Sequence, residues 1–132
     1  MKLSDAARKA KRVYLIGNGG SYANAVHICN DLLSVGIKAY TLDPATLTAI
    51  ANDHGYSQVF SKWIETVGES GDLLVALSGS GRSLNILEAM WAARGKGMET
   101  MLITNYLQEK DMQGSEEEQL TIGHAAMKEL RG

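Results

Sequence analysis

Serine and glycine alternate in one short stretch whose side chains could do chemistry. Residues 78–83 read Ser-Gly-Ser-Gly-Arg-Ser and lie between an apolar run and a helical pattern. Hydroxyls and backbone N–H groups at a helix start can together surround a phosphate dianion. An ordinary helix cap would need only one hydroxyl, that of Ser80 or Ser83. Because Ser78 adds a third hydroxyl, we favour a phosphate-binding loop formed by Ser78, Gly79, Ser80 and Ser83.

A second glycine-rich stretch follows the apolar run 13–16 and consists of Gly17, Asn18, Gly19, Gly20 and Ser21. Its glycines allow a tight turn, and the start of the following helix favours an anion. The stretch lacks the third glycine of the dinucleotide fingerprint, and the chain has no Gly-x-x-x-x-Gly-Lys-Ser/Thr motif. We therefore expect no nucleotide cofactor. By itself the motif fits a plain strand-to-helix turn equally well; beside residues 78–83 it predicts a second wall of the phosphate site.

His27 and Asp31 are four residues apart, a spacing that places them on one face of a helix. Such a pair could act as a general base or supply two ligands to a metal ion. A weak, solvent-exposed ion pair is the plainer interpretation of the spacing. A further histidine, His124, lies in the last helical pattern together with Glu116 and Gln119. There the plainer interpretation is an acidic first turn and one histidine on an amphipathic helix.

The elements that must position these residues alternate between strand and helix patterns. Strands are predicted at 13–16, 38–42, 72–77 and 99–103, and helices at 4–11, 21–35, 44–51, 56–67, 84–93 and 115–130. This alternation implies right-handed βαβ crossovers and an α/β fold, a three-layer α/β/α sandwich with a short parallel sheet of four to five strands. Both glycine-rich stretches then lie at the carboxyl edge of the sheet, where open parallel sheets bind ligands. We also expect Ser4 to cap the first helix, a turn at 52–55, and Trp63 and Trp91 in the core.

Bulk composition restricts the classes of function. A chain of 132 residues, 45% of them hydrophobic, suits one domain over residues 1–132. Its net charge of −2 argues against a general nucleic-acid binder. No apolar run approaches the roughly 20 residues that span a bilayer, so no membrane partner is expected. The single cysteine, Cys29, cannot form an internal disulfide, and no apolar secretory segment opens the chain, so we expect a cytoplasmic protein.

Several spaced motifs occur in a fixed order along the chain: Gly17–Ser21, His27 with Asp31, residues 52–55, Gly71 with Asp72, residues 78–85, and Gly97 with Met98. With these motifs the sequence resembles the sugar isomerase (SIS) domain, and specifically its phosphoheptose isomerase group. The resemblance covers about residues 13–103 and resumes over about 116–130. It implies the SIS-type fold, which is flavodoxin-like or Rossmann-like.

The resemblance also implies a reaction and an assembly. The reaction is the isomerisation of sedoheptulose 7-phosphate to D-glycero-D-manno-heptose 7-phosphate, an early step toward the heptose of bacterial lipopolysaccharide. The partners implied are this small sugar phosphate and further copies of the chain, as a tetramer or dimer with active sites shared between subunits. Some members of the group hold zinc.

Functional residues of the group fall on named positions of this sequence. The substrate-binding positions are Asn18, Gly19, Gly20, Ser21, Asp53, Ser78, Gly79, Ser80 and Ser83. The catalytic positions are Asp31, as base, and His124, as acid. The zinc-ligand positions are His27, Asp31, Glu116 and His124.

The sequence departs from the group's pattern at several of these positions. Asp31 stands where the group has glutamate, so its carboxylate reaches one methylene less. Glu116 replaces a glutamine, Gly79 a threonine and Arg82 an asparagine. The shorter Asp31 side chain and a shortened N-terminal segment leave a second function open, a non-catalytic phosphosugar-binding or regulatory module on the same fold. A nicotinamide-dependent enzyme is the least favoured alternative, because the third glycine is missing.

Overall fold

A computed structural model describes residues 2–104 and 112–132, with the backbone alone for 112–116. The elements in chain order are α1 (Leu3–Lys9), β1 (Val13–Gly17), α2 (Gly20–Ser34), β2 (Ala39–Thr41), α3 (Pro44–His54), the 3-10 turn η1 (Tyr56–Gln58), α4 (Val59–Val67), β3 (Leu73–Leu77), α5 (Leu84–Gly95), β4 (Glu99–Ile103) and α6 (Met112–Arg131). Within the described ranges, none of the helices has the length and apolar character needed to cross a membrane.

The four strands form one parallel sheet in the order β2-β1-β3-β4. Strands β1 and β3 are buried at every position, because helices cover both faces of the sheet. Gly17 pairs with Leu77, and Leu77 pairs with Ile103, so these three strands end level with one another. The stretches that follow β1 and β3 therefore leave the sheet side by side. The predicted parallel α/β architecture is confirmed.

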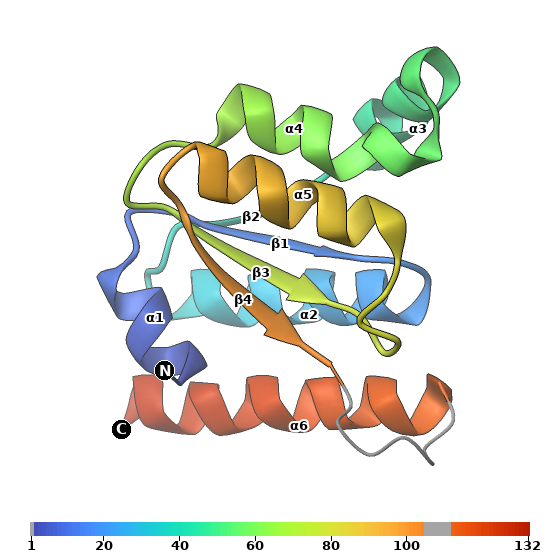
Figure 1. Cartoon of the computed structure of the whole chain (residues 1–132). Coiled ribbons are helices and arrows are strands. Elements are labelled where there is room, and N and C mark those ends of the chain that lie inside the picture. Colours follow the sequence, from blue (N-terminus) through green and yellow to red (C-terminus); the bar gives the residue numbers. More distant parts are fainter. Residues whose placement is uncertain (1, 105–111) are drawn as a thin grey trace.

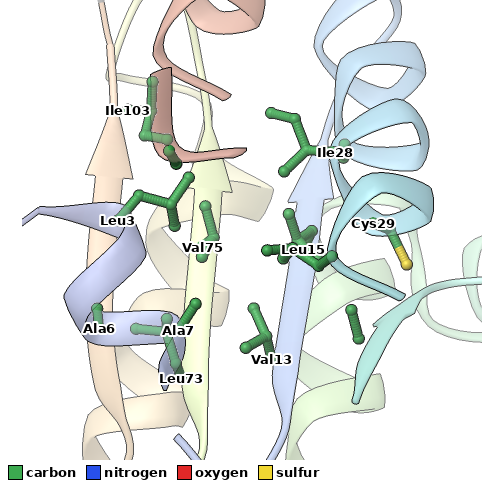
Figure 2. Close-up of a cluster of buried hydrophobic side chains, with 14 of the residues drawn as sticks. Leu3, Ala6, Ala7, Val13, Leu15, Ile28, Cys29, Leu73, Val75 and Ile103 are labelled. Atoms are coloured by element: carbon green, nitrogen blue, oxygen red, sulfur yellow. The ribbon is translucent and has the colours of Figure 1, made fainter. Parts of the chain in front are cut away.

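Helices pack on both faces of the sheet and make three layers (Figure 1). Helices α1, α2 and α6 cover one face, and α3, α4 and α5 cover the other. Side chains alternate along each strand, so Leu15 and Val75 point to the first face while Ile16 and Ala76 point to the second. Figure 2 shows the first of these two cores, in which Ile28 of α2 packs over the strands. Helix α2, which carries four of the predicted site residues (Gly20, Ser21, His27 and Asp31), is thus held against the central sheet.

One of the two tryptophans does not lie where its size predicts. Trp63 packs edge-on against Tyr14, with ring centroids 5.4 Å apart, in the second core. Trp91 is 76% exposed, so its predicted core position is wrong. Helix α5 turns its small and branched residues to the sheet, among them Ala89 and Ala93, and Trp91 lies on the opposite face.

Two local predictions near helix ends are also corrected. Ser4 does not cap α1, because Lys2 holds the N-cap position and Ser4 is buried inside the helix. The turn expected at 52–55 is mostly helix, since the Gly55 N–H still donates to the Ala51 carbonyl at 2.9 Å and closes the last turn of α3. Helix α6 begins at Met112, earlier than its predicted start.

Candidate active site

A small polar recess lies where the stretches after β1 and β3 meet. Its volume is about 30 Å³. The residues that line it are Asn18, Ser21, Leu77, Ser78, Gly79, Ser80 and Ser83. Gly17 permits the tight turn from β1 into α2, because a Cβ there would lie 2.6 Å from the Ser21 backbone. The structure therefore brings together both stretches that the sequence singled out.

The serines of the β3–α5 loop differ in their hydrogen bonds: Ser78 and Ser80 bind backbone N–H groups of the loop, and Ser83 lies at the start of α5. The Ser78 hydroxyl oxygen accepts a hydrogen bond from the Gly81 N–H at 3.0 Å, and the Ser80 oxygen accepts one from the Arg82 N–H at 3.1 Å. These two bonds fix the loop and use neither hydroxyl proton. The Ser78 and Ser80 hydroxyl oxygens also lie 3.5 Å apart, so one hydroxyl can donate to the other. Ser83 holds the N-cap position of α5, yet within the described residues its side chain makes no capping bond. One ordinary cap therefore does not account for the three serines.

A reciprocal amide pair joins the two walls of the recess. The Asn18 side-chain amide donates to the Asn85 oxygen at 2.9 Å, and the Asn85 amide donates back to the Asn18 oxygen at 2.9 Å. The Tyr56 hydroxyl donates to the same Asn18 oxygen at 2.8 Å. Asn85 is buried at the start of α5, so the pair ties the β1–α2 turn to that helix.

His27, Asp31 and His124 form a second polar cluster, with candidate ligand atoms all within 4.8 Å of one another. The His27 Nε2 atom lies 3.4 Å from the Asp31 carboxylate and 3.3 Å from the His124 Nε2 atom. Two imidazoles and a carboxylate are a donor set that suits a divalent metal ion. Nearby on α2, Cys29 faces the core, and burial raises the pKa of its thiol, so it offers no ready thiolate.

The cluster depends on a close approach of α6 to α2. A Cβ on Gly123 would lie 2.8 Å from the Ile28 side chain, well inside contact distance. Glycine at this position lets α6 lie against α2 and brings His124 beside His27. An open cavity of about 760 Å³ borders the cluster and is also lined by Lys128 and Arg131. A substrate-sized molecule could reach the cluster from this side.

The recess and the cluster lie on different faces of α2. Ser21 is 2% exposed, whereas the His27 side chain is 52% exposed. Six residues separate them, which is roughly 9 Å along the helix axis and about 120° around it. The serine-lined recess and the His27, Asp31 and His124 cluster of one chain therefore do not converge on one point.

The remaining predicted site residues lie elsewhere or outside the described side chains. Asp53 is exposed at the end of α3, where its carboxylate accepts a hydrogen bond from the Asn52 amide. Gly19 borders a separate, largely apolar recess of about 240 Å³, and Gly20 begins α2. The side chain of Glu116 falls outside the described part of the chain. Its eight-residue distance from His124 is roughly 12 Å along the helix axis.

Comparison with known proteins decides the family. The sequence pattern of the SIS domain matches residues 2–105. The chain belongs to the SIS domain family. A phosphoheptose isomerase from Sodalis glossinidius (strain morsitans) is 38% identical over 129 residues, which cover 92% of this chain and 66% of that protein. The chain spans 56–66% of the length of such curated relatives.

Solved SIS structures agree with this fold. A phosphoheptose isomerase from Neisseria gonorrhoeae superposes with a TM-score of 0.88 at 28% identity, covering 98% of this chain and 80% of that one. A phosphoheptose isomerase from Francisella tularensis gives a TM-score of 0.87 at 26% identity, covering 96% of this chain and 82% of that one. The predicted SIS-type architecture is confirmed.

Sequence patterns did not predict the contacts that Gln119 and Tyr56 make with residues of this SIS site. The Gln119 amide donates to the Ser21 hydroxyl oxygen at 3.1 Å, across 98 positions of sequence. Tyr56 reaches Asn18 across 38 positions. No local spacing connects such partners, because they meet only after the sheet and helices have packed. The only sequence feature that pointed to Gln119 was its polar side chain within an amphipathic helix. No sequence feature pointed to Tyr56.

Proposed function

We propose that this chain is a phosphosugar isomerase that interconverts sedoheptulose 7-phosphate and D-glycero-D-manno-heptose 7-phosphate. The observation that carries the proposal is that α2 begins at a serine-lined recess and bears, on another face, His27 and Asp31, which form a cluster with His124 of α6. The named relatives are phosphoheptose isomerases, which supports this choice of substrate. We place the enzyme in the cytoplasm, because its cysteine is a buried free thiol.

In this proposal the recess anchors the phosphate end of the sugar. Ser78, Ser80 and Ser83 donate their hydroxyl protons to phosphate oxygens from the β3 side, and Ser21 does so from the β1 side. The backbone around Gly19, Gly20 and Gly79 allows close approach, while Asn18 and Asp53 contact sugar hydroxyls. Anchoring the phosphate holds the reacting carbons in place and lowers the entropic cost of the reaction.

The chemistry is a proton transfer between adjacent carbons. The Asp31 carboxylate removes a proton from C1 of the ketose, which gives an enediol, and returns a proton to C2. His124 moves the second proton, from the C1 hydroxyl oxygen to the former carbonyl oxygen at C2. Atoms and charge balance, since one C–H and one O–H bond break and one of each forms.

The polar cluster fits a zinc ion as a resident cofactor. His27, Asp31 and His124 would hold the ion, and Glu116 is the proposed fourth ligand. A bound zinc ion would supply a positive charge that stabilises developing negative charge on a sugar oxygen. The residues themselves then orient the substrate and carry its protons.

We further propose a homo-oligomer, a tetramer or a dimer, whose sites combine groups from two copies. The recess and the cluster face different directions on α2 within one chain. A phosphate anchored in the recess of one copy would meet the Asp31 and His124 groups of a neighbouring copy. Measuring the mass in solution tests this assembly, and a strict monomer would contradict it.

Incubation of the purified protein with sedoheptulose 7-phosphate, with and without added zinc, tests the proposed activity. Aldose 7-phosphate should form and should be identified by chromatography against an authentic standard. The absence of aldose in both conditions would overturn the catalytic proposal.

A non-catalytic phosphosugar-binding or regulatory module is the second candidate function. The observation that favours it is that the recess is complete within one chain and uses neither Asp31 nor His124. The shorter reach of Asp31 than of the glutamate in the isomerase pattern points the same way. Sugar phosphate binding without turnover, unchanged by Asp31→Ala, would support this candidate over the isomerase.

A further inference from the structure

We infer that Gln119 is a positioning residue that aims the Ser21 hydroxyl proton into the phosphate recess. This inference rests on the proposed phosphate-binding function of the recess. Gln119 lies on α6, a different element from either loop, and it does not line the recess itself. It would act through Ser21, which does.

The hydrogen bonds around Gln119 have a fixed direction. The Asn24 side-chain amide donates to the Gln119 oxygen at 3.0 Å, so the Gln119 oxygen is used as an acceptor. The Gln119 nitrogen then points to Ser21 and donates to its hydroxyl oxygen at 3.1 Å. A hydroxyl that accepts here keeps one proton of its own to donate elsewhere. The Ser21 proton is thereby directed toward the recess.

Burial keeps water from substituting for the partners in these hydrogen bonds. Gln119 is 1% exposed and Ser21 is 2% exposed, so water does not readily replace either partner. Buried amides must use their donors and acceptors within the protein, and both ends of the Gln119 amide do so. Without Gln119, the buried Ser21 hydroxyl could turn its proton away from the recess. One donor to the phosphate would then be lost.

Two substitutions separate orientation from simple packing. Gln119→Met keeps the length of the side chain but removes the donor to Ser21. Gln119→Glu keeps both size and the bond from Asn24, yet it can only accept, so it would draw the Ser21 proton to itself. In each variant the Ser21 hydroxyl would no longer donate a hydrogen bond to the charged phosphate. Each variant should therefore bind inorganic phosphate about tenfold to a hundredfold more weakly. Glu117→Gln, on the exposed side of the same helix, is the matched control.

The test is a double-mutant cycle on phosphate affinity, measured by calorimetry with inorganic phosphate. Gln119→Met should weaken binding strongly in the wild-type background and less than about twofold in the Ser21→Ala background, because it acts through Ser21. In turnover, the KM for sedoheptulose 7-phosphate should rise while kcat changes little. A purely structural role would weaken binding equally in both backgrounds.

The outcomes distinguish the two proposals. If the wild-type protein binds neither inorganic phosphate nor the sugar phosphate, the phosphate recess is wrong and the role of Gln119 is wrong with it. If the wild-type protein binds and both Gln119 variants bind equally well, only the role of Gln119 is overturned. Thermal unfolding of each variant confirms that it is folded, and Gln119→Glu serves if Gln119→Met does not fold.

Discussion

At the residue scale, Asp31 is the group on which turnover depends in the proposed mechanism. Its carboxylate lies 3.4 Å from His27 and lines the open cavity beside His124. Asp31→Asn keeps the size of the side chain but removes the base, so kcat should fall by about 10²–10⁴. The isomerisation of sedoheptulose 7-phosphate measures this effect. Asp5→Asn, an exposed change on α1, should leave the rate unchanged, and full activity in Asp31→Asn would contradict the mechanism.

Residue types and spacing alone were enough to single out part of this site. His27 and Asp31 could be paired from sequence because four residues return a helix to the same face. His124 reaches them across 97 positions, so its place was implied only by resemblance to a family. The role of Asn85 depends on the Asn18 amide, which faces it across two loops. Such partnerships are products of tertiary packing and leave little trace in local patterns.

At the scale of elements, the contact between α2 and α6 should respond to one added methyl group. Gly123→Ala places a Cβ 2.8 Å from Ile28, a buried residue that has little room to move. Overpacking of this kind costs about 1–3 kcal/mol, against a gain of about 1 kcal/mol in helix propensity. We expect a net loss of stability and weaker zinc binding, as α6 carries His124 away from His27.

A matched glycine provides the control for this prediction. Gly95 is the last residue of α5, and a Cβ there meets nothing within 4 Å. Gly95→Ala should therefore leave stability unchanged or raise it slightly, with no effect on zinc affinity. Denaturant unfolding and zinc titration measure both variants. If Gly123→Ala behaves like Gly95→Ala, the close approach of the helices is not what holds the cluster together.

Helices α1 and α6 are joined by a polar contact that should depend on pH. The Ser4 hydroxyl donates to the Glu129 carboxylate at 2.6 Å, and Lys2 lies 3.1 Å from it. The Ser4 hydrogen bond, followed by that of Lys2, lowers the pKa of Glu129. A lowered pKa in the folded state means that this stabilisation is present above the ordinary glutamate pKa, about 4.3, and disappears as the pH falls through the folded-state value.

The corresponding experiment compares the wild-type protein with Glu129→Gln. The wild type should be more stable near neutral pH, and the difference should shrink in acid, below the ordinary glutamate range. Denaturant midpoints of both proteins, measured from neutral pH into that acid range, give this difference in stability. Ser4→Ala should reduce the same difference, because it removes the largest cause of the shift. A difference that stays constant with pH would contradict the assigned contact.

Element types and order were more predictable than element ends. Short apolar runs predicted the buried strands β1 and β3, and apolar residues at helical spacing predicted the helices between them. The parallel sheet could therefore be predicted from the sequence. Helix ends were less accurate, because one hydrogen bond, such as that from Gly55 to Ala51, extends a helix past residues that favour turns. The prediction for Trp91 was wrong because it rested on the size of the side chain, which favours burial. The exposure of Trp91 depends instead on the face of α5 on which it lies, and that face points away from the sheet.

At the scale of the whole molecule, the proposed sharing of sites between copies can be tested by complementation. An Asp31→Asn chain keeps its phosphate recess, and a Ser78→Ala/Ser83→Ala chain keeps its acid–base groups. Each variant alone should be inactive. After unfolding and joint refolding, mixed dimers with shared sites should recover about a quarter of wild-type activity, since half of the dimers are mixed and half of their sites are intact. No recovery would indicate that each chain completes its own site.

The sheet order also bears on how the chain is made. Strand β1 lies at the centre of the sheet, but one of its two neighbours, β3, follows some 60 residues later in the chain. During synthesis the apolar β1 strand therefore emerges long before that edge can be paired. Late-forming parallel pairings fold slowly and leave strand edges open to wrong partners. The growing chain should thus depend on chaperones most strongly until residue 77 has left the ribosome.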